Sequence, residues 1–338
     1  MPVIRTARTA AVLAAATALA LTGCSRGTQD GSSGTSSGKA SGKKTATLIM
    51  STMNNPFFVS VGKGAKSQAA TSGVKLSVEN ANNSDATALN LATTAVSKQV
   101  GALIIDPVSS TSATASVKQA NGAHIPVMAF DRKPQGGTLS CFIGYDAIQA
   151  GRNAADALAT SLGKKGTIVE IQGLLGTNVA QDRSKGFEEE IAKYPHIRTV
   201  AKHAADFDRA KALDVMTNTL QAHPDIDGVY AANDEMAMGA LAALKARNLT
   251  GKVRLVGNDG IADALAAIQA GTMYGTNAES PYALGQKVVG LAGKVLDGKK
   301  VTEEETLQGK LVTKSNVKAY ARYLVSIGDS ADVPATLR

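Results

Sequence analysis

Residues 46–60 read ATLIMSTMNNPFFVS, and this stretch decides the fold. An apolar, β-rich run at residues 46–51 ends in small polar residues, and a segment with helical spacing of apolar side chains follows at residues 57–71. A buried strand that leads into a helix is the repeating unit of a parallel sheet covered by helices.

The same alternation recurs along the chain. Further strands are expected at 75–79, 102–106 and 126–131, with helices at 85–99 and 112–121. The pattern then starts again, with strands at 167–172, 199–203, 228–232, 254–258 and 274–277 and helices at 178–193, 208–222, 235–247 and 261–270. The predicted fold class is α/β, with two Rossmann-like parallel-sheet lobes of similar size.

Composition and charge agree with this class. The 338 residues are 44% hydrophobic and 19% charged, which suits a folded chain of about two domains. Residues 1–44 hold six of the 36 basic residues and one of the 28 acidic ones, so residues 45–338 carry only about +3 of the net +8. No nucleic-acid partner is therefore expected.

The N-terminus has the layout of an export signal. Arg5 and Arg8 precede a small-residue apolar run at 10–21, which is too short for a permanent membrane span. The run ends in Leu-Thr-Gly-Cys24, which resembles a bacterial lipobox, whose cysteine carries a lipid; a simple signal peptide with an incidental cysteine is the alternative. We expect a signal peptide (1–23), a lipidated Cys24 with a flexible Gly/Ser tether (24–44), and attachment to the extracytoplasmic face of the cell membrane.

Cys141 is the second of only two cysteines. With Cys24 committed to lipid, one mature chain has no pair left for a structural disulfide. Phe142 and Ile143 follow Cys141, so we expect it to be a small buried hydrophobic residue rather than a nucleophile.

Polar and aromatic side chains follow nearly every predicted strand. The carboxyl ends of parallel strands meet at one edge of a sheet, where ligands bind. Asp, Asn and Arg groups match adjacent hydroxyls of a sugar, and aromatic faces cover its C–H surfaces. These residues predict a polyol site: Ser51, Asn54, Asn55, Phe57, Phe58, Asp106, Asp131, Arg132, Arg183, Asp206, Phe207, Asp208, Asn233, Asn258, Asp259 and Glu279.

Motifs for reaction chemistry are missing from the sequence. No Gly-Lys pair is followed by Ser or Thr as a phosphate loop requires, and His-Glu-x-x-His and Cys-x-x-Cys do not occur. The four histidines are scattered, so no metal, cofactor or catalytic residue is expected. The carboxylates at strand exits lie beside Arg or Asn, which leaves a glycoside-processing enzyme as the weaker alternative.

Six separated motifs resemble the ribose-binding proteins of bacterial ABC importers, which are type I periplasmic binding proteins. The motifs are STMNNPFFVS (51–60), FDR (130–132), EIQG (170–173), ADFDR (205–209), AHPD (222–225) and ANDEMA (232–237). The similarity runs from about residue 46 to 314. It implies two lobes joined by a three-stranded hinge with crossings near 145, 279 and 309, a monomer, a monosaccharide ligand and an ABC permease as partner.

The resemblance also implies how the chain is divided and which residues hold the sugar. The N-terminal lobe would comprise 45–145 plus 280–308, and the C-terminal lobe 146–279 plus 309–322, followed by a tail at 323–338. Ligand contacts would come from Ser51, Asn55, Phe57, Phe58, Asp131 and Arg132 in the first lobe and from Arg183, Phe207, Asn233 and Asp259 in the second. Phe58 and Phe207 would stack on the sugar ring.

Three positions depart from the ribose pattern. Asp106 stands where the family has Asn, Asn258 where it has Phe, and Glu279 where it has Gln. Two added carboxylates in a closed cleft need a proton, a cation or extra ligand donors. A ligand with more hydroxyl donors than ribopyranose, or with an amine, is one hypothesis. In the other, Asp106 and Glu279 face solvent or backbone N–H groups and ribose is the ligand.

The predicted function is that of the substrate-binding lipoprotein of an ABC-type sugar importer, which closes on its ligand by hinge motion. A receptor that presents its closed form to a membrane kinase is an alternative. A sugar-responsive repressor shares the fold, but it needs an N-terminal DNA-binding module, and residues 1–44 are signal and tether instead.

Overall fold

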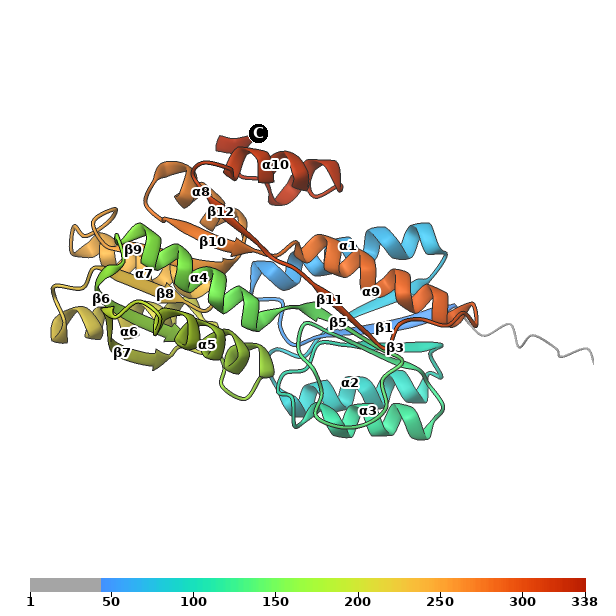
Figure 1. The fold of residues 1–338 in the computed structure, drawn as a ribbon. Helices are drawn as coiled ribbons and strands as arrows, with labels where there is room; N and C mark the ends of the chain where they lie inside the picture. Colours follow the sequence, from blue (N-terminus) through green and yellow to red (C-terminus); the bar gives the residue numbers. More distant parts are fainter. Residues whose placement is uncertain (1–43) are drawn as a thin grey trace, which may run out of the picture. The chain divides into compact units, whose positions relative to one another are not determined.

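The computed structural model describes residues 44–338, which form two α/β lobes, each built on a six-stranded sheet (Figure 1). The expected signal peptide, Cys24 and the tether up to residue 43 lie outside the described residues. Within residues 44–338, no helix combines the length and the apolar character that crossing a bilayer requires.

The first lobe has the strand order β11-β5-β4-β3-β1-β2, with every neighbouring pair parallel. Alternate residues of β1 serve two apolar cores, Leu48 and Met50 on one face and Ile49 on the other. Helices α1 and α9 cover the first face, and α2 and α3 cover the second. The elements are β1 (Thr45–Met50), α1 (Pro56–Ser72), β2 (Lys75–Asn80), α2 (Asp85–Ser97), β3 (Ala102–Ile105), α3 (Ala113–Gly122), β4 (Val127–Phe130), β5 (Cys141–Tyr145), α9 (Pro281–Leu296) and β11 (Glu304–Leu307).

The second lobe repeats this plan in the order β12-β10-β9-β8-β6-β7, with β12 antiparallel to β10 and the other pairs parallel. Helix α4 packs against α5, and α6 packs against α7. The elements are α4 (Ala147–Ser161), β6 (Lys165–Gln172), α5 (Asn178–Ile191), β7 (His196–Ala204), α6 (Arg209–Ala222), β8 (Gly228–Ala231), α7 (Asp234–Ala246), β9 (Arg254–Asp259), α8 (Ala262–Ala270), β10 (Gly275–Ala278), β12 (Lys310–Thr313), α10 (Val317–Ser326) and the 3₁₀ turns Ser330–Asp332 and Ala335–Leu337.

Both sheets reverse their strand order at the same point, between β1 and β3 in the first lobe and between β6 and β8 in the second. Loops and helix N-termini diverge on either side of such a switch point and leave a crevice at the carboxyl ends of the strands. The predicted fold class, two parallel-sheet α/β lobes, is confirmed.

Paired helices approach each other closely in both lobes. A Cβ atom on Gly64 of α1 would lie 2.0 Å from the carbonyl oxygen of Tyr282 in α9. A Cβ atom on Gly151 of α4 would lie 2.1 Å from the carbonyl oxygen of Arg183 in α5. Only glycine allows backbones to approach this closely, so the position of α5 depends on Gly151.

Three segments of the described chain cross between the lobes, after β5, β10 and β11, at the positions expected near 145, 279 and 309. The crossings are bonded to one another. The Tyr145 hydroxyl accepts the N–H of Ser280 at 2.8 Å and lies 3.2 Å from the Ser280 carbonyl, to which it donates. The N–H of Asp146 donates to the carbonyl of Leu307 at 2.9 Å.

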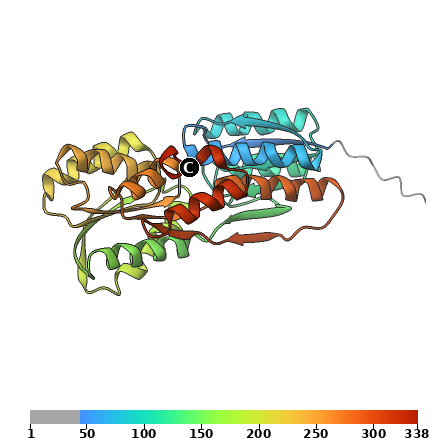
Figure 2. The ribbon, with the colours of Figure 1, turned by 90° about the horizontal axis from the view of Figure 1, so that it is seen from above.

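The C-terminal residues fold against the second lobe. The boundary expected after residue 322 falls inside α10, because the buried side of that helix continues to Leu324. Val333 is 1% exposed and belongs to the core of the second lobe. Beyond α10, Asp332 forms an ion pair at 2.6 Å with Lys63 of α1, so this segment also contacts the first lobe; Figure 2 shows α10 over the region where the lobes join.

Six elements have no counterpart in the sequence analysis: β5, α4, α9, β11, β12 and α10. Helix α4 buries mostly alanine along one face and leaves polar residues on the other, so its helical period is present in the sequence and was overlooked. Strands β11 and β12 have four residues each, of mixed polarity. Cys141 in β5 is 1% exposed, as expected from its apolar neighbours, and burial raises the pKa of its thiol.

Candidate ligand-binding site

A pocket with a free volume of about 20 Å³ lies between the two lobes at the carboxyl ends of their strands. That volume holds about one water molecule, so the lining must move apart to admit a ligand of one ring. The first lobe supplies half of its lining and the second lobe the other half. The lining residues are Asn55, Phe57, Phe58, Asp131, Arg132, Val179, Arg183, Phe207, Asn233 and Asp259.

Two asparagines of the cavity are helix caps. The side-chain oxygen of Asn55 accepts the N–H of Phe57 at the start of α1, and that of Asn233 accepts the N–H of Met236 at the start of α7. Because each carboxamide oxygen serves its cap, the NH₂ group is the part of each side chain left to donate to a ligand. The two caps therefore add hydrogen-bond donors, one from each lobe.

Backbone strain accompanies three cavity residues. Asp131, Phe207 and Asp259 have φ angles of 57°, 61° and 126°, which non-glycine residues rarely adopt. Strain of this kind costs about 1–3 kcal/mol per residue and gathers where side chains must be aimed at a ligand. The strained residues are two carboxylates and one aromatic ring, the groups that a sugar site uses.

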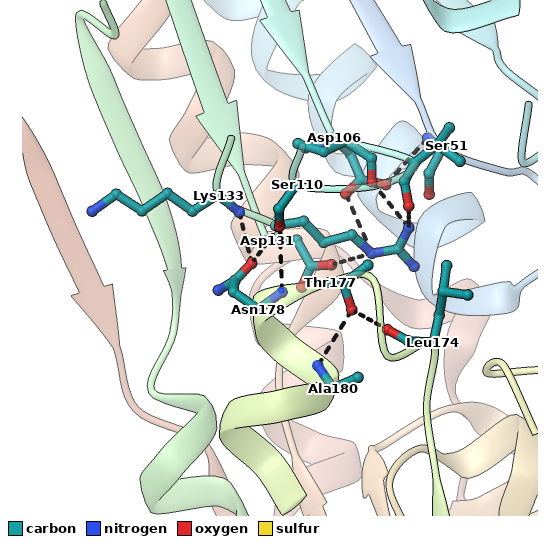
Figure 3. A network of polar contacts seen from close by, with 12 residues as sticks. Ser51, Asp106, Ser110, Asp131, Lys133, Leu174, Thr177, Asn178 and Ala180 are labelled. Atoms are coloured by element: carbon teal, nitrogen blue, oxygen red, sulfur yellow. Dashed lines mark hydrogen bonds and ion pairs between the residues drawn. The ribbon is translucent and has the colours of Figure 1, made fainter. Parts of the chain in front are cut away.

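Arg132 is held mainly by backbone carbonyls. Its Nη1 donates to the carbonyls of Pro107 at 3.0 Å and Val108 at 3.4 Å. Its Nε lies 3.8 Å from Asp131 Oδ2 and 3.9 Å from Asp106 Oδ1, which are ion contacts longer than hydrogen bonds (Figure 3). We call these residues the Arg132 centre.

Two aromatic rings from opposite lobes flank the same arginine. The guanidinium carbon of Arg132 lies 5.4 Å from the ring centroid of Phe58 and 5.7 Å from that of Phe207. Both distances are within the range of cation–π attraction. Arg132 thus contacts the second lobe directly, across the cavity.

Arg183 is held mainly by carboxylates. Its Nη2 donates to both carboxylate oxygens of Glu279, at 3.0 and 3.1 Å. Its Nη1 donates to the carbonyl of Ala232 at 2.9 Å and lies 3.6 Å from Asp259 Oδ1. Asn258 Nδ2 donates to Glu279 at 3.0 Å and to Asp259 at 3.2 Å. We call these residues the Arg183 centre.

Burial shifts the carboxyl groups of both centres toward their protonated forms. It raises the pKa of Asp106 from its ordinary value of 3.8 to about 7, and Arg132 opposes the shift only in part. The pKa values of Glu279 and Asp259 are raised by the same cause and lowered in part by Arg183. The site can therefore hold a proton near neutral pH, which reduces its excess of negative charge.

Of the thirteen site residues given by the family resemblance and its three departures, the structure brings nine together in the lining of one cavity: Asn55, Phe57, Phe58, Asp131, Arg132, Arg183, Phe207, Asn233 and Asp259. The other four, Ser51, Asp106, Asn258 and Glu279, are buried but do not line it. Val179 lines the cavity and was not predicted, because an apolar residue at the start of a helix carries no functional signal.

Neither added carboxylate faces solvent, since Asp106 and Glu279 are 0% and 1% exposed. Asp106 Oδ2 accepts the backbone N–H of Ser51 at 3.1 Å, and Glu279 is bonded to Arg183 and Asn258. Each carboxylate contacts an arginine that lines the cavity, Asp106 contacting Arg132 and Glu279 contacting Arg183. The charges that line the cavity itself are two arginines and two aspartates, and these balance.

Within residues 44–338, no group of three or more His, Cys, Asp or Glu side chains is placed to hold a metal ion. The cavity instead offers guanidinium and amide donors, carboxylate acceptors and aromatic faces from two lobes. This arrangement defines a two-lobed solute-binding protein with a polar site between its lobes.

Comparison with known proteins gives the family. A family model described as periplasmic binding protein domain matches residues 46–300, and the chain belongs to this family. It is 39% identical over 270 residues to the ribose import binding protein RbsB of Escherichia coli, covering 80% of this chain and 90% of the relative. It is 32% identical over 271 residues to a xylitol-binding protein of Mycolicibacterium smegmatis, covering 80% and 77%.

A solved structure of a solute-binding protein has a similar fold. An ABC transporter solute-binding protein from Bacillus halodurans with bound myo-inositol superposes with a TM-score of 0.79 at 29% identity, covering 83% of this chain and 98% of the other. The family consists of solute-binding proteins of the extracytoplasmic side, so the predicted resemblance is confirmed at this level.

Proposed function

We propose that this protein binds one uncharged monosaccharide or related polyol in the cavity between its lobes and delivers it to an ABC permease. The single observation that carries the proposal is the balanced set of two arginines, two aspartates and two amide donors around one cavity between the lobes. Relatives named for ribose and xylitol and a neighbour with bound myo-inositol support the ligand class. All three ligands are uncharged and rich in hydroxyl groups.

The positions of Asp106 and Glu279 favour ribose or a similar neutral sugar over an aminosugar. Each is bonded to protein donors, and neither lines the cavity, so the ligand need not neutralise them. An ammonium group on the ligand would instead meet the guanidinium groups of Arg132 and Arg183 across a small cavity.

Closure of the lobes is the mechanism of capture. A ring held between Asp131 and Arg132 on one side and Arg183 and Asp259 on the other makes its full set of contacts only in the closed state. The ligand therefore shifts the equilibrium by its differential affinity for that state. The protein acts by binding alone, and each carboxylate of the cavity lies beside an arginine, as recognition requires.

A panel of sugars tests the ligand class. The thermal midpoint of the purified protein should rise with one or more of D-ribose, D-allose, xylitol and myo-inositol, because ligand at 100 times its Kd adds about 2.7 kcal/mol of stability. Glucosamine should leave the midpoint unchanged. A rise with glucosamine alone would contradict the proposal.

Attachment to the membrane through Cys24 completes the proposed role. A lipid anchor would hold the protein on the extracytoplasmic face beside its permease. Radiolabelled palmitate should label the wild type in cells and should not label Cys24→Ser, which should appear in the medium or the periplasm. Equal labelling of the two proteins would refute the anchor and leave the sugar site unaffected.

A further inference from the structure

Hydrogen bonds join the two lobes at a place beside the cavity. Asn178 Oδ1 accepts the backbone N–H of Lys133 at 2.9 Å, and the N–H of Asn178 donates to Ser110 Oγ at 3.3 Å (Figure 3). The N–H of Ser110 donates to the carbonyl of Gly176 at 3.2 Å. We call Ser110, Lys133, Gly176 and Asn178 the interlobe latch.

Every bond of the latch connects one lobe to the other. Ser110 and Lys133 follow strands β3 and β4 of the first lobe, and Gly176 and Asn178 lie in the loop and first turn that lead into α5 of the second. Opening of the hinge separates these elements, so the bonds exist in the closed state alone.

The second-lobe side of the latch is fixed before closure. Thr177 is fully buried, and its hydroxyl accepts the N–H of Ala180 and donates to the carbonyl of Leu174 (Figure 3). These bonds lie within one lobe and survive opening. They hold Asn178 in position, so little conformational entropy is lost when the latch forms.

Latch residues are chain neighbours of cavity residues. Lys133 directly follows Arg132, whose guanidinium also donates to Val108, in the segment that leads to Ser110. Asn178 begins the helix that carries Arg183. The four latch residues are absent from the cavity lining, so they hold the lobes together without touching a ligand there.

We propose that the interlobe latch sets how tightly the protein binds its ligand without affecting which ligand it selects. This inference rests on the proposed function. The latch stabilises only the closed state, so its loss lowers the fraction of closed protein and raises the apparent Kd by the same factor for every ligand. Loss of one neutral hydrogen bond of the latch corresponds to a change of about 5-fold.

Asn178→Ala tests the latch, with Asn121→Ala as the matched control. Asn121 also exchanges two hydrogen bonds, with Thr138, but both lie within the first lobe and persist on opening. Of the three bonds of the latch, Asn178→Ala removes only the bond from Lys133, because the other two bonds use backbone groups of Asn178 and Gly176. By calorimetry, the variant should raise the Kd of D-ribose, D-allose and myo-inositol about 5-fold wherever the wild type binds them, with the ratios preserved. Asn121→Ala should leave each Kd within about twofold, and Asn178→Asp, which keeps the acceptor oxygen, should bind nearly as the wild type does.

An unchanged Kd in Asn178→Ala would overturn the latch and leave the sugar site intact. A changed order of preference would show that Asn178 contacts the ligand, which also overturns it. If the wild type binds none of these sugars, hydrogen exchange of the unliganded protein decides. The amides of Ser110 and Lys133 should exchange faster in Asn178→Ala than in the wild type and Asn121→Ala, and equal rates would refute the latch.

Discussion

The two arginine centres face each other across the cavity, yet they are held in different ways. Arg183 shares both oxygens of Glu279 in short hydrogen bonds, and this carboxylate belongs to a hinge crossing. Arg132 donates to two backbone carbonyls and lies beside the rings of Phe58 and Phe207. The carboxylates of Asp131 and Asp106 lie farther away, at 3.8 and 3.9 Å. Each lobe thus uses a separate means to fix the same group.

The two arginines should therefore differ in how much they contribute to the stability of the fold and to ligand binding. Arg183 neutralises buried carboxylates within its own lobe and the hinge, so it contributes to folding as well as to binding. Arg132 has looser ion contacts and a ring from the opposite lobe, so a larger share of its interactions depends on closure. Burial raises the pKa of Glu279, and Arg183 opposes that shift in part.

The largest effects should come from removing the arginines. Arg183→Met and Arg132→Met should each weaken sugar binding by about 100-fold or more, because a charged donor to the ligand is lost. Arg183→Met should also lower the free energy of unfolding by about 3 kcal/mol, since Glu279 and Asp259 remain buried without a cation. Arg132→Met should lower it clearly less. Calorimetry and urea unfolding measure the two quantities, and equal losses of stability would erase the contrast between the centres.

The close helix crossings should give the next largest effects. Gly64→Ala and Gly151→Ala place a methyl group about 2 Å from a backbone oxygen, so each should cost about 2–3 kcal/mol in urea unfolding. Gly151→Ala displaces the backbone of Arg183 and should also weaken sugar binding by the folded protein. Gly64→Ala, in the first lobe, should leave the Kd nearly unchanged. If both variants bind like the wild type, α5 does not position Arg183 through this contact.

The smallest effect concerns the pH dependence of stability. Burial raises the pKa of Asp106 in the first lobe and of Glu170 in the second to about 7, and both side chains are fully buried. A raised carboxyl pKa stabilises the fold below the unfolded value and loses that contribution as pH rises through 7. Each group should cost about 1 kcal/mol of stability between pH 6 and pH 8.

Neutral isosteres test this dependence. Asp106→Asn and Glu170→Gln should each reduce the fall in unfolding free energy over that range by a similar amount, and the double variant should reduce it by the sum. Urea unfolding at pH 6, 7 and 8 provides the measurement. If neither substitution alters the dependence of the unfolding free energy on pH, groups other than Asp106 and Glu170 cause it.

Part of the site could be predicted from the sequence. Strand exits such as Asp131 and Arg132 were predictable, because a buried run that ends in charge marks the edge of a parallel sheet. The sequence did not predict which residues at that edge line the cavity. Asp106 and Asp131 both follow strands, but only Asp131 lines the cavity. Asp131 has a left-handed φ of 57°, which Asp106 does not have and which no sequence pattern indicated.

Several elements outside the two predicted repeats were missed. Helix α4 has a buried face of mostly alanine opposite a polar face, so the sequence held the signal for this helix, which packs tightly on α5. Strands β11 and β12 take their conformation from the sheets they join. Their short, mixed sequences gave no local signal, and long-range pairing decided their structure.

The lobes are also interleaved along the chain. Strand β11 and helix α9, which complete the first lobe, come from residues 281–307, after most of the second lobe. The first sheet therefore has an open edge and an apolar face that only α1 covers until synthesis has passed residue 307. A nascent chain of this design stays incompletely folded for nearly its whole length, which is the condition that threading through a narrow export channel demands.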